Sequence, residues 1–114
     1  MKVFESTLSH LSDLNLEGVE QKLVMWQYKS WPDNGAPDDV WSLFQIIHSL
    51  KQMNPSCTLI HCNDGVGPTG TFIALAKLID KIHCNAQKLN VFQTVLDLRK
   101  ERKYMVIILS LKSL

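Results

Sequence analysis

Arginine is scarce in this chain of 114 residues, which carries only Arg99 and Arg102. Net charge is also nearly absent, at +1, so the sequence lacks the basic excess that draws a protein to nucleic acid or to an anionic membrane. No hydrophobic run reaches the length of a membrane span. With 46% hydrophobic and 20% charged residues and no repeats, the sequence predicts one small globular domain over residues 1–114, with neither nucleic acid nor membrane as a partner.

Cysteine is too sparse for a disulfide framework, because the three residues Cys57, Cys62 and Cys84 cannot all pair. A reducing cytoplasm therefore suits the chain best. For Cys57 and Cys84 we expect buried, structural positions. Neither the cysteines nor the nearby His61 and His83 form a Cys-x-x-Cys pair or a histidine pair at ligand spacing, so we predict no metal and no cofactor.

Glycine is also rare, yet three of the five glycines fall in one loop, at Gly65, Gly67 and Gly70. This loop joins an apolar, strand-like run to an apolar, helix-like run. Glycines in this arrangement let backbone N–H groups turn inward around an oxyanion, and a helix N-terminus adds partial positive charge. Cys62 stands at the start of the loop, where oriented amides favour a thiolate nucleophile.

Two other motifs are weaker interpretations of the same loop. Residues 65–70 satisfy Gly-x-Gly-x-x-Gly, but Asn90 stands where a dinucleotide-binding fold would place an acidic residue. An ATP-binding loop would need lysine and then serine or threonine where Thr71 and Phe72 stand. An oxyanion cradle with a nucleophile remains the better hypothesis.

The hydrophobic pattern predicts an α/β fold. Strands are expected at Val3–Ser9, Leu23–Tyr28 and Cys57–His61, the first two as a hairpin. Helices are expected after an N-cap in Pro37-Asp38-Asp39, from about Thr69 to Ile82, and from Asn90 to about Arg102. The charged run 99–103 is expected to be a solvated helix end. Apolar residues of the first helix, aromatic ones included, are expected in the core: Val40, Trp41, Leu43, Phe44, Ile46, Ile47 and Leu50.

The loop resembles the signature of the protein tyrosine phosphatase family, which is His-Cys, five residues, Arg, Ser or Thr, and Gly. His61-Cys62 and Thr69-Gly70 match that signature. Trp31-Pro32-Asp33, followed by Asn34-Gly35, resembles the mobile acid loop that lies upstream of the cysteine in this family. We identify the chain as a member, and the resemblance implies the C-terminal half of the family fold, an incomplete mixed sheet with flanking helices. Both ends of the chain suggest truncation.

The resemblance also implies roles for single residues. Cys62 matches the nucleophile and Asp33 the general acid. Trp31 and Pro32 support the acid loop, and His61 supports the cysteine. The residues that match the phosphate-binding loop are Asn63, Asp64, Gly65, Val66, Gly67, Thr69 and Gly70.

Pro68 departs from the signature at the position of its arginine. That guanidinium grips two phosphate oxygens in the family, whereas proline offers neither charge nor donor. The glutamine expected after Tyr104-Met105-Val106, which positions water for hydrolysis in the family, is Ile107 here. We therefore expect little or no turnover.

Three hypotheses about function remain open. The chain is an inactive phosphatase homologue that retains a phosphate-binding loop, a weakly active phosphatase that uses Cys62 and Asp33, or a decayed gene product. The expected partners are a phosphotyrosine protein or free phosphate, and a protein that covers an exposed sheet edge. The sequence of residues 63–67 resembles that of phosphatase-like proteins from the polydnaviruses of parasitoid wasps. For a protein of that type, the expected location is the cytoplasm of the host cell.

Overall fold

The computed structural model describes residues 1–6, 23–32, 35–55 and 57–106. Three strands and three helices follow one another in the order β1, β2, α1, β3, α2, α3. Their bounds are β1 (Lys2–Ser6), β2 (Leu23–Gln27), α1 (Val40–Met53), β3 (Cys57–His61), α2 (Pro68–His83) and α3 (Val91–Glu101). Each expected strand and helix is thus present, and the remainder of the expected first strand lies outside the described residues.

The sheet has the order β2-β1-β3, so that β1 is the central strand. Val3 of β1 lies opposite Trp26 on one side and Ile60 on the other, and both pairings are antiparallel. The expected mixed sheet is therefore wrong for the described strands. The expected pairing of the first two strands is confirmed. Several side chains of the outer strands are exposed, among them Leu23, Met25 and Leu59.

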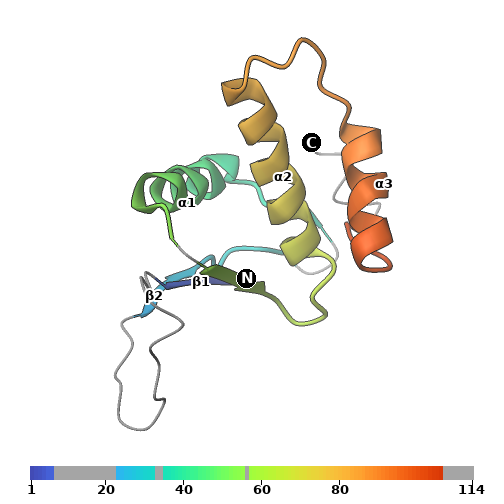
Figure 1. Cartoon of the computed structure of the whole chain (residues 1–114). Coiled ribbons are helices and arrows are strands. Elements are labelled where there is room, and N and C mark those ends of the chain that lie inside the picture. Colours follow the sequence, from blue (N-terminus) through green and yellow to red (C-terminus); the bar gives the residue numbers. More distant parts are fainter. Residues whose placement is uncertain (7–22, 33–34, 56, 107–114) are drawn as a thin grey trace, which may run out of the picture.

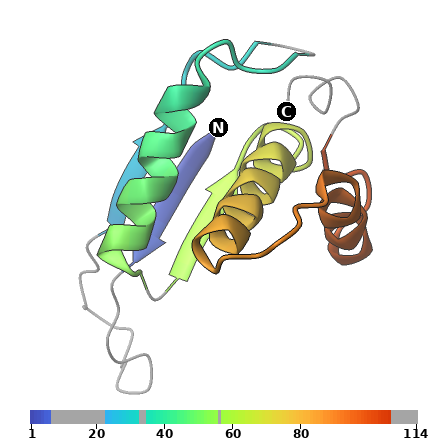
Figure 2. The same cartoon turned by 90° about the horizontal axis from the view of Figure 1, so that it is seen from above.

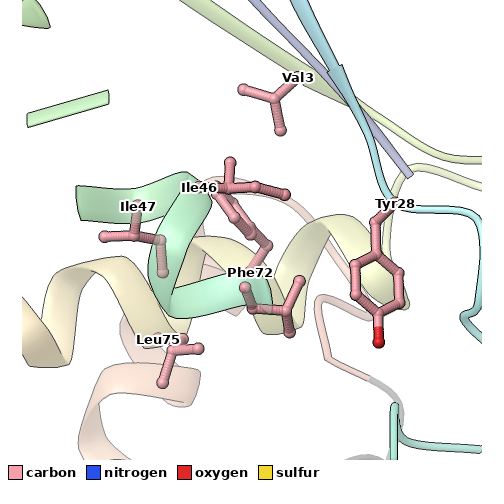
Figure 3. Close-up of a cluster of buried hydrophobic side chains, with 7 residues drawn as sticks. Val3, Tyr28, Ile46, Ile47, Phe72 and Leu75 are labelled. Atoms are coloured by element: carbon pink, nitrogen blue, oxygen red, sulfur yellow. The ribbon is translucent and has the colours of Figure 1, made fainter. Parts of the chain in front are cut away.

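Helices α1 and α2 lie on the same side of the sheet, and α3 packs against α2 (Figures 1 and 2). The main core forms where the two inner helices meet the sheet (Figure 3). It joins residues of β1, α1 and α2 with the residue that follows β2: Val3, Tyr28, Leu43, Ile46, Ile47, Phe72 and Leu75. Burial of each large side chain stabilises the fold by about 1.5–3 kcal/mol.

A second, smaller core lies between α2 and α3. It consists of Ala74, Val95, Leu98, Met105 and Val106. Because Met105 and Val106 follow α3 in the chain, this core draws the segment after the helix back toward α2. It thereby places that segment beside the loop at the start of α2.

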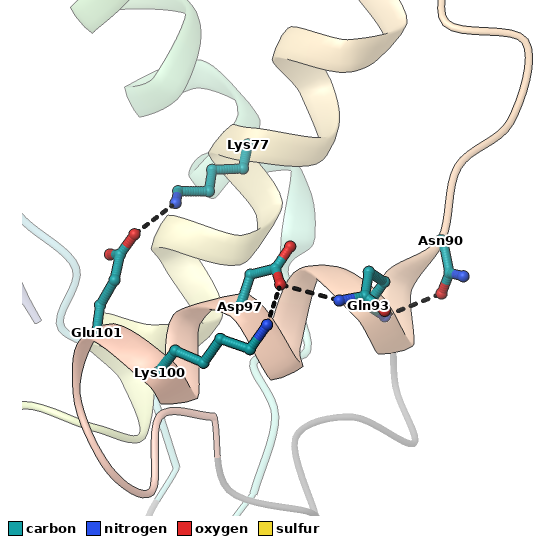
Figure 4. A network of polar contacts seen from close by, with 6 residues as sticks. All are labelled: Lys77, Asn90, Gln93, Asp97, Lys100 and Glu101. Carbon is teal, nitrogen blue, oxygen red and sulfur yellow. Dashed lines mark hydrogen bonds and ion pairs between the residues drawn. The ribbon is translucent and has the colours of Figure 1, made fainter.

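Two helix starts follow the capping chemistry that the sequence predicts. The Asp39 carboxylate accepts a hydrogen bond from the Ser42 N–H at the start of α1. The Asn90 side chain accepts one from the Gln93 N–H, at 2.9 Å, at the start of α3 (Figure 4). The Gln93 amide donates onward to Asp97 at 2.9 Å. Each side-chain oxygen satisfies a helix N–H that has no partner within its own helix.

The expectation that the aromatic residues of α1 belong to the core is wrong. Trp41 is 70% exposed and Phe44 is 38% exposed, whereas Leu43 and Ile47 are buried. Helical spacing was correctly predicted, but the buried arc of α1 is narrower than its apolar pattern. Within the described residues, no helix has the length and apolar character needed to cross a bilayer.

Candidate functional site

The glycine-rich loop leads from β3 into α2, and hydrogen bonds within the loop converge on the sulfur of Cys62. The Gly65 N–H donates to Cys62 Sγ at 3.2 Å, and the Thr69 hydroxyl donates to it at 3.0 Å. Gly65 adopts φ +73°, a conformation that glycine tolerates far better than other residues. The structure thus brings the predicted nucleophile, a loop amide and the Thr69 hydroxyl together.

The Asp64 carboxylate lies inside the same loop. Its Oδ1 accepts hydrogen bonds from the N–H groups of Val66, at 2.9 Å, and Gly67, at 3.1 Å. These two bonds, the Val66 bond foremost, hold the pKa of Asp64 below its ordinary value. The Cys62 thiol also points to this oxygen, with Sγ 3.4 Å away. Two amides that were predicted to bind an oxyanion therefore donate hydrogen bonds to the chain's own Asp64 carboxylate.

Pro68 occupies the first position of α2, directly after the N-cap residue Gly67. A proline is well tolerated there, because the N–H it lacks would have had no partner within the helix. The first helical hydrogen bonds form behind it, from the N–H of Gly70 to the Val66 carbonyl and from that of Thr71 to the Gly67 carbonyl. The proline therefore removes a cation from the site without interrupting the helix.

Met105 and Val106, which follow α3, form a brace that supports the loop. The Val106 N–H donates to the Val66 carbonyl at 2.9 Å. Arg99 holds this segment in turn, because its guanidinium donates to the carbonyls of Met105, at 2.9 Å, and Val106, at 2.8 Å. The expectation of a solvated helix end is therefore wrong for Arg99, which is half-buried.

Arg102 is the second arginine that the structure brings to the loop. Its Nη2 lies 3.5 Å from the Asp64 carbonyl oxygen and 3.0 Å from the point that a Cβ on Gly65 would occupy. The side chain is exposed and donates to a backbone carbonyl of the loop. Sequence reasoning missed both arginines as parts of the site, since they stand 37 and 40 positions after Cys62 in the chain.

Other residues predicted for the site lie around the loop or outside the described residues. Asn63 and His61 are exposed. Trp31 packs against the main core, and its indole N–H donates to the Gly35 carbonyl at 3.0 Å, whereas Pro32 is exposed. Asp33, the predicted general acid, lies outside the described residues, as does Ile107. The structure therefore tests neither role.

The remaining cysteines contradict their expected burial, because Cys57 and Cys84 are both exposed and free. Cys57 begins the outer strand β3, and Cys84 follows the last turn of α2. Among the described residues, no three His, Cys, Asp or Glu side chains are placed to hold a metal ion. The described strands also contain no parallel pair, which a dinucleotide-binding unit would require.

Replacing Gly70 with alanine should destabilise the fold, although alanine favours a helix by about 1 kcal/mol. A Cβ on Gly70 would lie 2.6 Å from the backbone nitrogen of Val106, so the brace would have to move. Overpacking of this kind costs about 1–3 kcal/mol, which exceeds the gain in helix propensity. Thermal unfolding should show a lower melting temperature, whereas Lys77→Ala, at an exposed position of the same helix, should change it little. A higher melting temperature for Gly70→Ala would contradict the close contact.

The geometry defines a class of protein, one with a cysteine that accepts hydrogen bonds inside a glycine-rich turn leading into a helix. The chain matches the protein-tyrosine phosphatase family over residues 3–110 and belongs to that family.

Individual relatives are receptor-type members of the family. The chain is 36% identical over 108 residues to receptor-type tyrosine-protein phosphatase eta of Gallus gallus, and 38% identical over 108 residues to that of Homo sapiens. Each alignment covers 90% of this chain. Receptor-type tyrosine-protein phosphatase epsilon of Rattus norvegicus is 39% identical over 82 residues, or 69% of this chain. The chain spans only 8% to 12% of the length of these relatives.

Proposed function

We propose that this chain is a phosphatase homologue that binds phosphate-bearing ligands without appreciable turnover. The single observation that carries this proposal is Pro68 at the first position of α2, beside a retained Cys62 and its two donors. The loop keeps the cysteine of the family signature and turns three backbone N–H groups inward, but residues 61–70 contain no lysine or arginine. We also propose that this makes the chain a degenerate member of the family.

The transition-state stabilisation lost with the guanidinium is large enough to account for a lack of turnover. Two charge-assisted hydrogen bonds are worth about 1.5–3 kcal/mol each, and in the transition state their loss amounts to roughly 3–6 kcal/mol. That corresponds to a rate lower by about 10²–10⁴. Arg102 donates to the carbonyl of Asp64 at 3.5 Å and thus contacts the backbone of the loop.

Hydrolysis of p-nitrophenyl phosphate tests the proposal directly. The unmodified chain and Cys62→Ser should give the same rate, since background hydrolysis would account for both. Turnover that disappears in Cys62→Ser would contradict the proposal. It would instead support a weakly active phosphatase with Asp33 as the general acid, which the placement of the Thr69 hydroxyl 3.0 Å from the sulfur favours.

Oxyanion binding and cooperative unfolding test the other half of the proposal. A binding protein should unfold in one transition and should melt at a higher temperature in inorganic phosphate than in chloride of equal ionic strength. A chain without a cooperative transition would instead support decay of the gene product.

The partners we propose are a phosphotyrosine protein or free phosphate at the loop. A second protein surface that covers the outer strands is also proposed, since Leu23, Met25 and Leu59 are exposed there. The cytoplasm is the proposed setting, because the three cysteines are free and a reducing environment would preserve them. For a chain of polydnavirus type, that would be the cytoplasm of the host cell.

A further inference from the structure

Three N–H donors of the loop already have partners within the loop. The Gly65 N–H bonds to the sulfur of Cys62, and the Val66 and Gly67 N–H groups bond to Asp64 Oδ1. An oxyanion that entered the loop would need inward-pointing amides of this kind. It would therefore meet a carboxylate on the two amides nearest the start of α2.

We propose that Asp64 is the resident anion of this loop and sets its affinity for ligands. In this arrangement phosphate binds only as the carboxylate leaves the amides of Val66 and Gly67. The inference rests on the proposed function, in which the loop accepts oxyanions, and adds the residue that controls that step. Alanine at position 64 would leave both amides open.

Electrostatics strengthens the competition. The Asp64 carboxylate is charged at neutral pH, and hydrogen bonds from the Val66 and Gly67 N–H groups lower its pKa further. A displaced carboxylate remains tethered to the loop, so it would repel a phosphate that carries between one and two negative charges. Pro68 supplies no cation to offset that repulsion. The Arg102 guanidinium donates to the backbone carbonyl of Asp64 at 3.5 Å, on the main chain of the loop.

Titration of inorganic phosphate into ¹⁵N-labelled protein at constant ionic strength, followed by the amide signals of Val66 and Gly67, tests the proposal. Asp64→Ala should bind phosphate about 10-fold to 100-fold more tightly than the unmodified chain, and Asp64→Asn should lie between them. Asp80→Ala and Asp80→Asn are matched controls. They remove the same charge from the far end of α2, where Asp80 pairs with the exposed Lys51.

Each outcome separates the inference from the function on which it rests. Equal, measurable affinity in the unmodified chain and in Asp64→Ala would overturn the role of Asp64 and leave the binding function standing. Equal gains in the Asp64 and Asp80 variants would reduce the effect to net charge and also overturn it. Absence of binding in every variant would overturn the binding function, and the inference with it. Should Asp64→Ala fail to fold, the phosphate affinities of Asp64→Asn and Asp80→Asn decide whether Asp64 controls binding.

Discussion

Pro68→Arg, combined with Asp64→Ala, should accelerate release of p-nitrophenol from p-nitrophenyl phosphate by about 10³-fold over Asp64→Ala alone. Pro68 is the first residue of α2, a position that accepts any good helix former, so the substitution restores a cation and a backbone N–H without a change of fold. Alanine at position 64 leaves the loop amides open to the phosphate. The missing cation and the competing carboxylate, which both weaken binding of the transition state, are then corrected together.

A rapid burst of product is the expected form of this activity. In the family, the thiolate attacks phosphorus and expels the phenolate, and a glutamine then positions water to hydrolyse the phosphocysteine. Ile107 stands at the position of that glutamine. Stopped-flow measurements should therefore show about one product released per chain, followed by a slow phase. Slow hydrolysis of the intermediate explains the second phase.

Three controls make this expectation specific. Adding Cys62→Ser should abolish the burst, because the nucleophile is gone. Lysine at position 68 should give a smaller gain than arginine, since an ammonium cannot form two parallel hydrogen bonds to one phosphate. A double variant with no Cys62-dependent burst would show that position 68 is not where catalysis is blocked.

The elements of this fold could be predicted from sequence because their signals are local. Asp39 and Asn90 are caps whose partners lie three residues further on, and β3 has the predicted bounds. Which arc of a helix is buried depends on its neighbours. Trp41 lies about 160° around α1 from Leu43 at 100° per residue, so one apolar pattern contains both a core residue and an exposed one.

Prediction of the site was also incomplete, because several of its contacts depend on the folded backbone and on helix packing. Cys62 and the glycines identify the loop, since their spacing is short and specific. The bonds of Asp64 to the loop amides depend on the backbone angles of the turn, which the sequence pattern does not state. The contacts of Arg99 and Arg102 depend on the packing of α3 against α2, which brings distant residues beside the loop.

Arg99→Ala should lower the free energy of unfolding by about 3 kcal/mol. The guanidinium makes two hydrogen bonds, to the carbonyls of Met105 and Val106, and charge-assisted bonds are worth about 1.5–3 kcal/mol each, with the lower value suited to a half-buried group. Truncation also leaves both carbonyls without this donor. Since a small domain is stable by about 5–15 kcal/mol in total, the loss is a large fraction of the stability.

Urea unfolding and thermal melting measure this effect, and a loss of about 3 kcal/mol should lower the melting temperature by about 10 °C or more. Lys100→Ala is the matched control, because it removes the same charge from the next position of α3, where an exposed pair with Asp97 contributes little. Arg99→Lys should fall between the two, since it keeps the charge but not the planar pair of donors. Equal stability of Arg99→Ala and Lys100→Ala would mean that the brace does not hold Val106 against the loop. A large difference would tie the shape of the cysteine loop to an arginine on another helix.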